Sequence, residues 1–337
     1  MAKAVLLLNL GTPAEPTAKG LREFYRYFFA DPFVFDINPL GRWLLRNLII
    51  LPLRAPKTAR QYAAIWTDEG SPLKVYTDRL QQAMQAAFDE GVHVRIGMAY
   101  SEPLIKQALD ELEQLGCREI LLLPLFPQYS TATTASVFHA VRQATGKWRE
   151  APTLKFVEDL YAEPAFIRAW TMLINKHLIP DSGDHLIFSY HGLPESNILK
   201  ADDKGCCSFG DCCDAVGEDN RLCYRAQCFA TTRAVVDALN WPQERYSIAF
   251  QSRFGRQAWI QPYLDEHLSD LLAKGVRRVA VVTPSFVSDC LETIHEIGIE
   301  YKEQFMGEGG ESFTLVPNLN DELFWHTALT EIARKHL

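Results

Sequence analysis

Two kinds of apolar pattern alternate along the chain. Short runs in which nearly every residue is apolar are typical of strands buried on both faces of a sheet. Such runs occupy residues 4–10, 94–100, 120–123, 186–190, 246–251 and 278–284. Between several of them, apolar residues recur at the spacing of an amphipathic helix. Helix-to-strand units of this kind predict parallel sheets with right-handed crossovers, and hence an α/β fold.

One such helix-to-strand unit occurs twice. Residues 103–123 (PLIKQALDELEQLGCREILLL) align without a gap with residues 262–282 (PYLDEHLSDLLAKGVRRVAVV). In both copies a proline precedes the helical pattern, and a glycine ends it at the same place. We therefore predict two similar, doubly wound, Rossmann-like parallel-sheet halves, residues 1–150 and 151–337, with a ligand-binding cleft between them.

Composition and charge narrow the class of protein. The 337 residues are 47% hydrophobic and 23% charged, which is typical of a folded globular protein. The formal net charge of −8 argues against nucleic acid as a partner, since that function needs a basic face. The apolar start at residues 1–9 runs directly into a turn, without the cleavage site of a signal peptide or the length of a membrane span. We predict a cytoplasmic protein.

Residues 33–53 qualify this localisation, because apolar side chains dominate the segment. Pro39, Arg42 and Arg46 interrupt it, so it cannot form a membrane-spanning helix. Two interpretations remain. The segment is either a helix packed into the core, or an apolar lip that contacts a membrane or an apolar ligand while its arginines lie near headgroups. The second interpretation predicts peripheral membrane contact.

Candidate chemistry comes from two places in the second half. Glu292, Glu296 and Glu300 share one face if their segment is helical. A solvated acidic face is the ordinary interpretation, whereas carboxylates stacked in an interior site need a cation or transferable protons. His191 directly follows the strand at 186–190, at the carboxyl end where open α/β sheets bind ligands. Together these residues predict a site that binds a metal ion or moves protons.

The loops at the strand ends lack nucleotide-binding fingerprints. Neither the G-x-G-x-x-G pattern nor a Walker A lysine is present, so we expect a ligand other than a nucleotide. A run of hydroxyl side chains at 129–136 either caps the next helix or hydrogen-bonds a ligand that carries carboxylates.

Six of the eight cysteines lie in a predicted insertion at residues 205–228: Cys206, Cys207, Cys212, Cys213, Cys223 and Cys228. A cytosolic location argues against a disulfide framework, so the density of thiols predicts a metal site. Zinc held by four thiolates and an iron–sulfur cluster both fit. Adjacent side chains diverge, so we expect one ligand from each pair, in the set Cys206, Cys213, Cys223 and Cys228. The members of each pair are interchangeable at this level.

Several motifs together resemble the ferrochelatase family, whose members insert ferrous iron into a porphyrin. The resemblance covers nearly the whole chain. Its strongest motifs are FSYHGLP at Phe188–Pro194 and SDCLETIHE at Ser288–Glu296. Further matches, in the family's order, are Leu8–Pro13, Gly70–Lys74, Pro127–Ser130, Gln251–Gly255 and Trp259.

The resemblance implies roles for individual residues. It makes His191 and Glu292 the iron-binding and catalytic pair, and it makes Glu296 a further catalytic residue on an acidic path that continues to Glu300. The implied porphyrin-pocket residues are Tyr129, Ser130 and Trp259, and the implied lip is residues 33–53. The cysteine insertion resembles that of a bacterial subgroup with a [2Fe–2S] cluster, which favours iron–sulfur over zinc.

One position departs from the family pattern. Ala99 stands where many members have an arginine before a tyrosine, so the role of that arginine cannot be transferred. Arg22, Arg26 and Arg253 are the candidates to replace it.

The expected activity is that of a lyase that makes haem from a porphyrin, with protoporphyrin IX expected and a coproporphyrin not excluded by sequence. The alternatives are a chelatase for another tetrapyrrole or metal, and a redox- or iron-sensing iron–sulfur protein. A monomer and a homodimer fit the sequence equally well.

Overall fold

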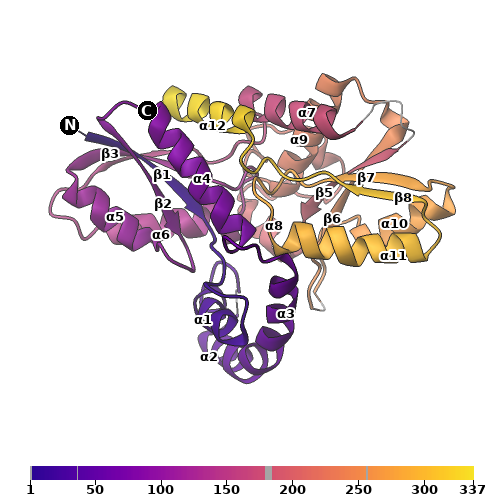
Figure 1. Ribbon diagram of the computed structural model, residues 1–337, viewed down its shortest axis with the longest axis horizontal. Coiled ribbons are helices and arrows are strands. Elements are labelled where there is room, and N and C mark those ends of the chain that lie inside the picture. The colour runs from indigo at the N-terminus through magenta and orange to yellow at the C-terminus, as the bar shows by residue number, and fades with distance from the viewer. Residues whose placement is uncertain (1, 36, 179–183, 256) are drawn as a thin grey trace. The chain divides into compact units, whose positions relative to one another are not determined.

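The computed structural model describes residues 2–35, 37–178, 184–255 and 257–337, and it contains two compact units (Figure 1). Unit 1 comprises Met1–Phe126, Thr131–Asp159 and Asn320–Leu337, whereas unit 2 comprises Pro127–Ser130 and Leu160–Leu319. The chain therefore passes between the units several times instead of once near residue 150. Among the described residues, no helix is long and apolar enough to cross a bilayer.

Unit 1 contains a four-stranded parallel sheet in the order β2-β1-β3-β4. Its strands are β1 (Ala2–Asn9), β2 (Val92–Met98), β3 (Cys117–Pro124) and β4 (Thr153–Phe156). The central strand β1 is fully buried from Ala4 to Leu8. Because helices cover both faces of a parallel sheet, such a strand reads as a continuous apolar run and not as an alternating one.

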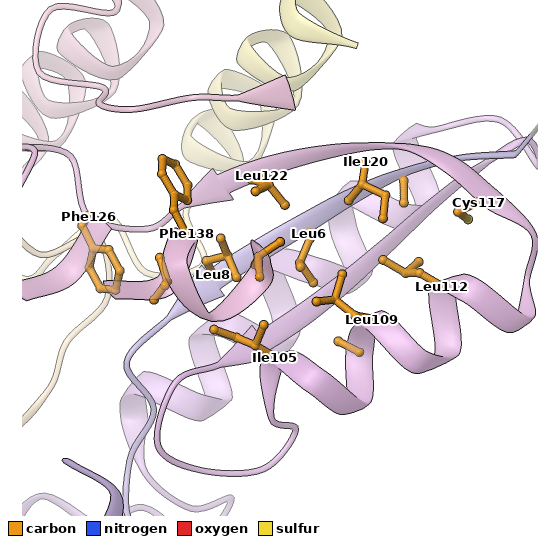
Figure 2. Packing of buried hydrophobic residues seen from close by; sticks show 14 residues of the cluster. Leu6, Leu8, Ile105, Leu109, Leu112, Cys117, Ile120, Leu122, Phe126 and Phe138 are labelled. Atoms are coloured by element: carbon orange, nitrogen blue, oxygen red, sulfur yellow. The ribbon is translucent and has the colours of Figure 1, made fainter. Parts of the chain in front are cut away.

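Four helices of unit 1 bury one face each against this sheet: α4 (Pro72–Ala87), α5 (Ile105–Gln114), α6 (Ser136–Thr145) and α12 (Leu323–His336). The short π-helix η2 (Thr131–Ala135) directly precedes α6. Figure 2 shows the face of α5 with Ile105, Leu109 and Leu112 directed at Leu6 and Leu122 of the sheet. The helical periodicity in the sequence thus corresponds to the packed face of α5.

Four helices at the indigo end of the chain form a separate group within unit 1 (Figure 1). They are α1 (Ala18–Phe28), α2 (Pro39–Leu44), the π-helix η1 (Leu45–Arg54) and α3 (Ala55–Ile65). Most apolar side chains of the 33–53 segment are exposed here, among them Leu40 at 68% and Leu53 at 69%. Of the described residues in this segment, only Ile50 and Leu51 are buried. A helix packed into the core does not describe this segment, and an exposed apolar lip does.

Unit 2 repeats the architecture with a parallel sheet in the order β6-β5-β7-β8. Its strands are β5 (His185–His191), β6 (Tyr246–Gln251), β7 (Arg278–Val282) and β8 (Ser312–Leu315). Its helices are α7 (Pro164–His177), α8 (Glu195–Ala201), η3 (Asp211–Cys213), α9 (Tyr224–Leu239), η4 (Gln243–Arg245), α10 (Leu264–Ala273), the π-helix η5 (Leu291–Tyr301) and α11 (Lys302–Gly307).

The predicted pair of similar α/β halves is confirmed. The unit α5–β3 in one sheet and the unit α10–β7 in the other have the same helix length and the same place in the strand order. The glycines that end the two helical patterns, Gly116 and Gly275, both adopt positive φ, at 72° and 87°. This left-handed conformation is open to glycine without steric cost. The cleft expected between the halves stays a prediction.

Candidate active site

His191 is the last residue of β5, where the sheet of unit 2 exposes its carboxyl ends. Its backbone is fixed from two sides, because its N–H donates to Ser285 Oγ at 3.1 Å and its carbonyl accepts from Tyr224 Oη at 2.8 Å. Its ring Nδ1 lies 2.6 Å from the carbonyl oxygen of Gly192. A carbonyl only accepts, so Nδ1 carries the hydrogen of this bond. The second ring nitrogen, Nε2, is then the one with a lone pair available to a metal ion or a proton.

Burial lowers the pKa of His191 below its usual 6.5, and the negative charge of Glu292 opposes part of this effect. The bond to the Gly192 carbonyl acts in the same direction as Glu292. Because desolvation is the largest of the three causes, the imidazole is neutral around neutral pH. A neutral imidazole is the form that can accept a proton or ligate a metal.

The glutamates lie on η5, and the structure corrects the type of helix. We expected ordinary helical spacing, but residues 291–301 form a π-helix, whose hydrogen bonds join residues five apart. Residues four apart still follow one another on the same side of so wide a helix. Glu292 and Glu296 are half-buried, and Glu300 is exposed. The stripe therefore runs from the interior to the surface and is not a fully solvated face.

Glu296 is the most strongly perturbed carboxyl group of the stripe. Burial raises its pKa from 4.5 to about 7, although a hydrogen bond from Ser252 lowers it and the charge of Glu292 raises it further. Ser252 Oγ donates to Glu296 Oε2 at 2.5 Å, and Tyr301 Oη lies 3.5 Å from Oε1. Glu296 is accordingly close to half-protonated at neutral pH, which suits a group that passes protons on. At the outer end, Glu300 Oε1 lies 3.5 Å from His295 Nδ1.

Gln251 and Ser252 connect these groups, and sequence reasoning gave them no role beyond a motif match. Gln251 is the end of β6 and lies opposite His191 in the parallel register. Its side-chain Nε2 donates to the carbonyl of Glu292 at 2.9 Å. Ser252 adopts φ of +66°, a strained conformation for a residue other than glycine. The available signal was their position, since the carboxyl ends of neighbouring parallel strands converge at one edge of a sheet.

The predicted pocket residues lie near this edge or near the helix that supports it. Trp259 is buried, its indole N–H donates to the Phe254 carbonyl at 2.9 Å, and its ring lies against Gly192. The backbone N–H of Tyr129 donates to Gln227 Oε1 at 2.7 Å on α9, the helix that also carries Tyr224. Ser130, next to Tyr129, is buried.

Two of the three candidates for the missing arginine have other side-chain partners. Arg253 lies 3.2 Å from Asp265 and 3.3 Å from Glu266, and its guanidinium stacks on the ring of Tyr263. Arg22 Nε donates to the carbonyl of Leu51 in the lip. The carbonyl of Arg26 accepts from Arg46, another residue of the lip. The side chain of Arg22 is thus tied to the lip and that of Arg253 to an acidic pair in unit 2, whereas Arg26 contacts the lip through its backbone.

The cysteine insertion brings four thiols into a chain of contacts. Cys207 hydrogen-bonds to Cys212, the sulfurs of Cys212 and Cys213 are 3.9 Å apart, and Cys213 hydrogen-bonds to Cys223. Two of the sequence-predicted ligands lie outside this chain. The Cys206 thiol faces Asp202 at 3.5 Å, and the fully buried Cys228 contacts Tyr224. In the part of the chain that the structure describes, no three metal-binding side chains already surround a single point.

The two-half architecture is also found in solved structures of other proteins. The chain is similar to SirB from Bacillus subtilis with Fe3+, with a TM-score of 0.57 and 11% identity over 100% of this chain and 96% of that one. It is also similar to CbiX, the terminal enzyme for biosynthesis of siroheme in denitrifying bacteria, with a TM-score of 0.52 and 14% identity over 99% and 100%. At these identities the likeness establishes the fold. The fold defines an α/β protein of the two-half class.

Sequence comparison identifies the family within this class. The ferrochelatase family model matches residues 2–337. The chain is 42% identical over 337 residues to a ferrochelatase of Coxiella burnetii, covering 99% of this chain and 93% of the relative. It is 38% identical over 335 residues to a ferrochelatase of Legionella pneumophila, covering 99% of both. The chain belongs to the ferrochelatase family. It is a porphyrin metal chelatase, a lyase whose substrates are a porphyrin and ferrous iron.

Proposed function

We propose that His191 and Glu292 carry out the insertion, with His191 Nε2 accepting pyrrole protons and Glu292 binding the incoming ferrous ion. Insertion releases two protons from the porphyrin, so the site needs proton acceptors as well as metal ligands. The observation that carries this assignment is the bond from Nδ1 to the Gly192 carbonyl, which leaves Nε2 as the basic nitrogen. A neutral imidazole and a carboxylate also form the mixed nitrogen and oxygen set that suits Fe(II).

The binding site also has to deform the substrate. A planar porphyrin shields its own N–H groups from simultaneous contact with metal and base, so insertion requires a bent ring. Pocket residues that fit the bent ring better than the flat one lower the barrier. We assign this part to Trp259, Tyr129 and Ser130. The support for Trp259 is its place against Gly192, directly after the proposed base.

The remaining glutamates relay protons or metal ions between the site and solvent. Glu296 is half-buried and Glu300 is exposed, so the stripe on η5 spans the required distance from interior to surface. The pKa of Glu296, about 7, allows it to gain and lose a proton at neutral pH. The reverse division, in which the glutamates take the pyrrole protons and His191 guides the metal, predicts a different response to substitution.

The decisive experiment compares His191→Ala and Glu292→Gln in an anaerobic assay of Fe(II) insertion. We expect either change to lower the rate at least about a hundredfold, because each removes a group that acts only during the reaction. Porphyrin binding, followed by fluorescence, should remain measurable in both variants. Normal turnover in a folded variant would remove that residue from the mechanism. Loss of metal affinity only in His191→Ala would favour the reverse division.

We propose protoporphyrin IX as the porphyrin. The support is the exposed apolar lip, which suits a substrate with apolar edges. The test compares protoporphyrin IX with coproporphyrin III, which carries two more carboxylates. Each is assayed with Fe(II), Co(II) and Zn(II) under the same conditions. A higher kcat/KM for coproporphyrin III would overturn the assignment.

We propose that the cysteine insertion holds a [2Fe–2S] cluster through Cys207, Cys212, Cys213 and Cys223. These four thiols form a continuous chain of pairwise contacts, in which the sulfurs of the adjacent Cys212 and Cys213 are 3.9 Å apart, and thiolates are the ligands that such clusters take. Cys213 and Cys223 also belong to the sequence-predicted set. Cys206 is the weaker candidate, because its thiol faces the Asp202 carboxylate, which disfavours a second negative charge. A bound cluster would supply a one-electron redox couple.

Single Cys→Ser variants test the ligand set through the visible spectrum and acid-labile sulfide. We expect Cys207→Ser and Cys212→Ser to lose the sulfide-to-iron bands, and Cys206→Ser and Cys228→Ser to keep them. The opposite result would restore the sequence-predicted set. A colourless protein that contains zinc would overturn the cluster itself.

We also propose that the lip makes peripheral membrane contact. Seven of its apolar side chains are exposed: Ile37, Leu40, Trp43, Leu44, Leu48, Ile49 and Leu53. Arg42 and Arg46 lie among them, where they can meet anionic headgroups. Cosedimentation with phosphatidylglycerol vesicles should fall when Leu40 and Leu53 are both changed to Asp. Equal cosedimentation of both proteins would count against membrane contact.

A further inference from the structure

Gln251 is a buried amide at the end of β6, with only 1% of its surface exposed. Both ends of its side chain are hydrogen-bonded. Oε1 accepts from Ser189 Oγ at 2.7 Å, and Nε2 donates to the carbonyl oxygen of Glu292 at 2.9 Å. Its own carbonyl accepts from the N–H of Gly192 at 2.8 Å. One residue therefore bonds to β5, to the turn after β5 and to η5.

These three partners surround the two groups that perform the proposed reaction. Ser189 precedes His191 by two residues and Gly192 follows it, so Gln251 is bonded on both sides of the imidazole. Its third bond reaches the backbone of Glu292 itself. The hydrogen-bond partners determine the orientation of the amide. In the flipped orientation, Oε1 would face the carbonyl oxygen of Glu292, and two oxygens that can only accept would lie against each other. The parallel pairing of β5 with β6 adds a second restraint, in which His191 and Gln251 are register partners.

We propose that Gln251 is a positioning residue that sets the placement of the Glu292 carboxylate relative to the His191 imidazole. This inference rests on the proposed function of that pair. The carbonyl of Glu292 lies in the first turn of the π-helix η5 and accepts a hydrogen bond from Gln251, a residue outside this helix. Gln251 supplies this donor from the rigid sheet, and the reaction depends on the resulting geometry more than on the bond itself.

The experiment uses two substitutions in the full chain. Gln251→Met keeps the length of the side chain and removes both polar ends. Ser189→Ala is milder, since it removes only the hydroxyl that orients the amide. We expect Gln251→Met to lower kcat by about tenfold to a hundredfold, the range that follows misplacement of reacting groups by about 1 Å. The KM for the porphyrin should change less than about twofold, because the substrate-binding residues are untouched.

The double variant separates positioning from independent damage. If both residues act through one bond, Ser189→Ala should add little to the loss of kcat in Gln251→Met. Multiplicative losses would show that the two residues act separately and would overturn the inference. If kcat is unchanged in both single variants, Ser189→Ala and Gln251→Met, the inference is overturned as well. Ser189→Ala keeps the proposal testable if Gln251→Met does not fold.

A matched control exists in unit 1. Gln85 also bridges backbone groups with both ends of its amide, since Nε2 donates to Val92 O at 2.9 Å and Oε1 accepts from Val94 N at 2.8 Å. Gln85→Met should reduce the melting temperature without lowering kcat. An equal loss of kcat in both glutamine variants would make the effect a general result of destabilisation. The His191→Ala variant distinguishes failure of the proposed function from failure of this inference. If the proposed function is wrong, His191→Ala inserts iron normally, whatever the effect of Gln251→Met.

Discussion

At the scale of single residues, the bond between Ser252 and Glu296 sets the proton affinity of the acidic stripe. The hydroxyl donates to the carboxylate and so stabilises its charged form, which opposes the burial that raises its pKa to about 7. Glu292, Glu300 and Tyr301 also face this carboxyl group, and the two glutamates favour its protonated form.

Ser252→Ala should therefore raise the pKa of Glu296 further. If ionised Glu296 accepts protons during insertion, the rising limb of kcat against pH lies near pH 7 and moves to higher pH in this variant. Ser252→Gly is the matched control, because it also lacks the hydroxyl but relieves the strain of φ +66°. Both variants should show the same shift, with Ser252→Gly the more stable by about 1 kcal/mol. A profile that does not move would exclude Glu296 from the rate-limiting protonation step.

The sequence could identify residues whose role is chemical, but it could not identify residues whose role is to hold others in place. The sequence placed His191 at the end of a strand and Glu292 on a helical acidic stripe, and the structure has them there, whereas their catalytic roles stay a proposal. Gln251 was not predictable, because an amide has no distinctive chemistry and its value lies in three bonds that only the folded chain forms. The cysteine pairs were left open for the same reason, since spacing does not say which thiol of a pair faces its neighbours.

At the scale of elements, the start of η5 is held by a buried polar network. Asp289 Oδ1 accepts from Thr293 Oγ1 at 3.1 Å and from Asn318 Nδ2 at 3.0 Å. Thr293 Oγ1 in turn accepts from the N–H of Cys290 at 3.0 Å. Asn318 Oδ1 accepts from Thr283 Oγ1 at 2.7 Å, which ties the network to the end of β7. All the residues of this network are buried.

Thr293→Val should destabilise the protein by about 1–3 kcal/mol. The isosteric side chain fills the same space but leaves the Cys290 N–H without its acceptor and removes a donor to Asp289. Thr293→Ser retains the hydroxyl and loses only a methyl group, which costs about 1 kcal/mol. Chemical denaturation of both variants measures the difference. If Thr293→Ser is as unstable as Thr293→Val, packing of the methyl group matters more than the network.

The type of helix in η5 was beyond the reach of the sequence. Apolar and acidic residues at three- and four-residue intervals fit an α-helix and a π-helix almost equally, because the spacing is close to one turn in both. What distinguishes them is the hydrogen-bond partner of each N–H, which depends on how the helix is anchored at its ends. The lip posed a similar problem, since an apolar pattern does not say whether the apolar face is covered.

At the scale of the whole molecule, stability depends on pH through groups outside the active site as well as through Glu296. Two histidines of unit 2 share one serine hydroxyl: His185 Nε2 and His267 Nε2 lie 2.9 Å and 2.7 Å from Ser247 Oγ. Burial lowers the pKa of His185 to about 4, and the positive charges of His267, Arg245 and Lys274 contribute. Burial also lowers the pKa of His267, with Lys274 acting in the same direction and Asp270 opposing it.

A pKa that is lower in the folded state than in the unfolded state gives stability that is present above the unfolded value and is lost as the pH falls. For His185 this window runs from about 6.5 down to about 4. The opposite sign holds for Glu296, whose raised pKa gives stability that is lost as the pH rises from about 4.5 through about 7. The two contributions oppose each other across the mildly acidic range.

His185→Gln should separate them, because glutamine offers a polar nitrogen near the place of Nε2 and does not titrate. Melting temperatures of the parent and the variant should converge, or cross, as the pH is lowered from 7 to 5. Glu296→Gln should show its difference from the parent mainly above pH 6. Parallel curves for His185→Gln and the parent would exclude His185 as a source of acid sensitivity.

The architecture was the part of the molecule most open to prediction. Buried parallel strands and amphipathic helices alternate along the chain. The repeated unit at 103–123 and 262–282 indicated that the same fold occurs twice. The division into compact units was harder, because it depends on contacts between distant segments. The helix α12 illustrates this: it follows the strands of unit 2 in sequence, but packs on α4 and β3 of unit 1, where Trp325 and Leu329 are fully buried.

That return of α12 affects how the polypeptide matures during translation. All four strands of unit 2 precede α12 in the chain, so they leave the ribosome before this helix does, and this unit can begin to form its core first. The other sheet is synthesised earlier, yet β3 and α4 stay uncovered until α12 has been made. The first half to be translated is therefore the last to be finished, and in the interval its uncovered apolar surface is a natural substrate for chaperones.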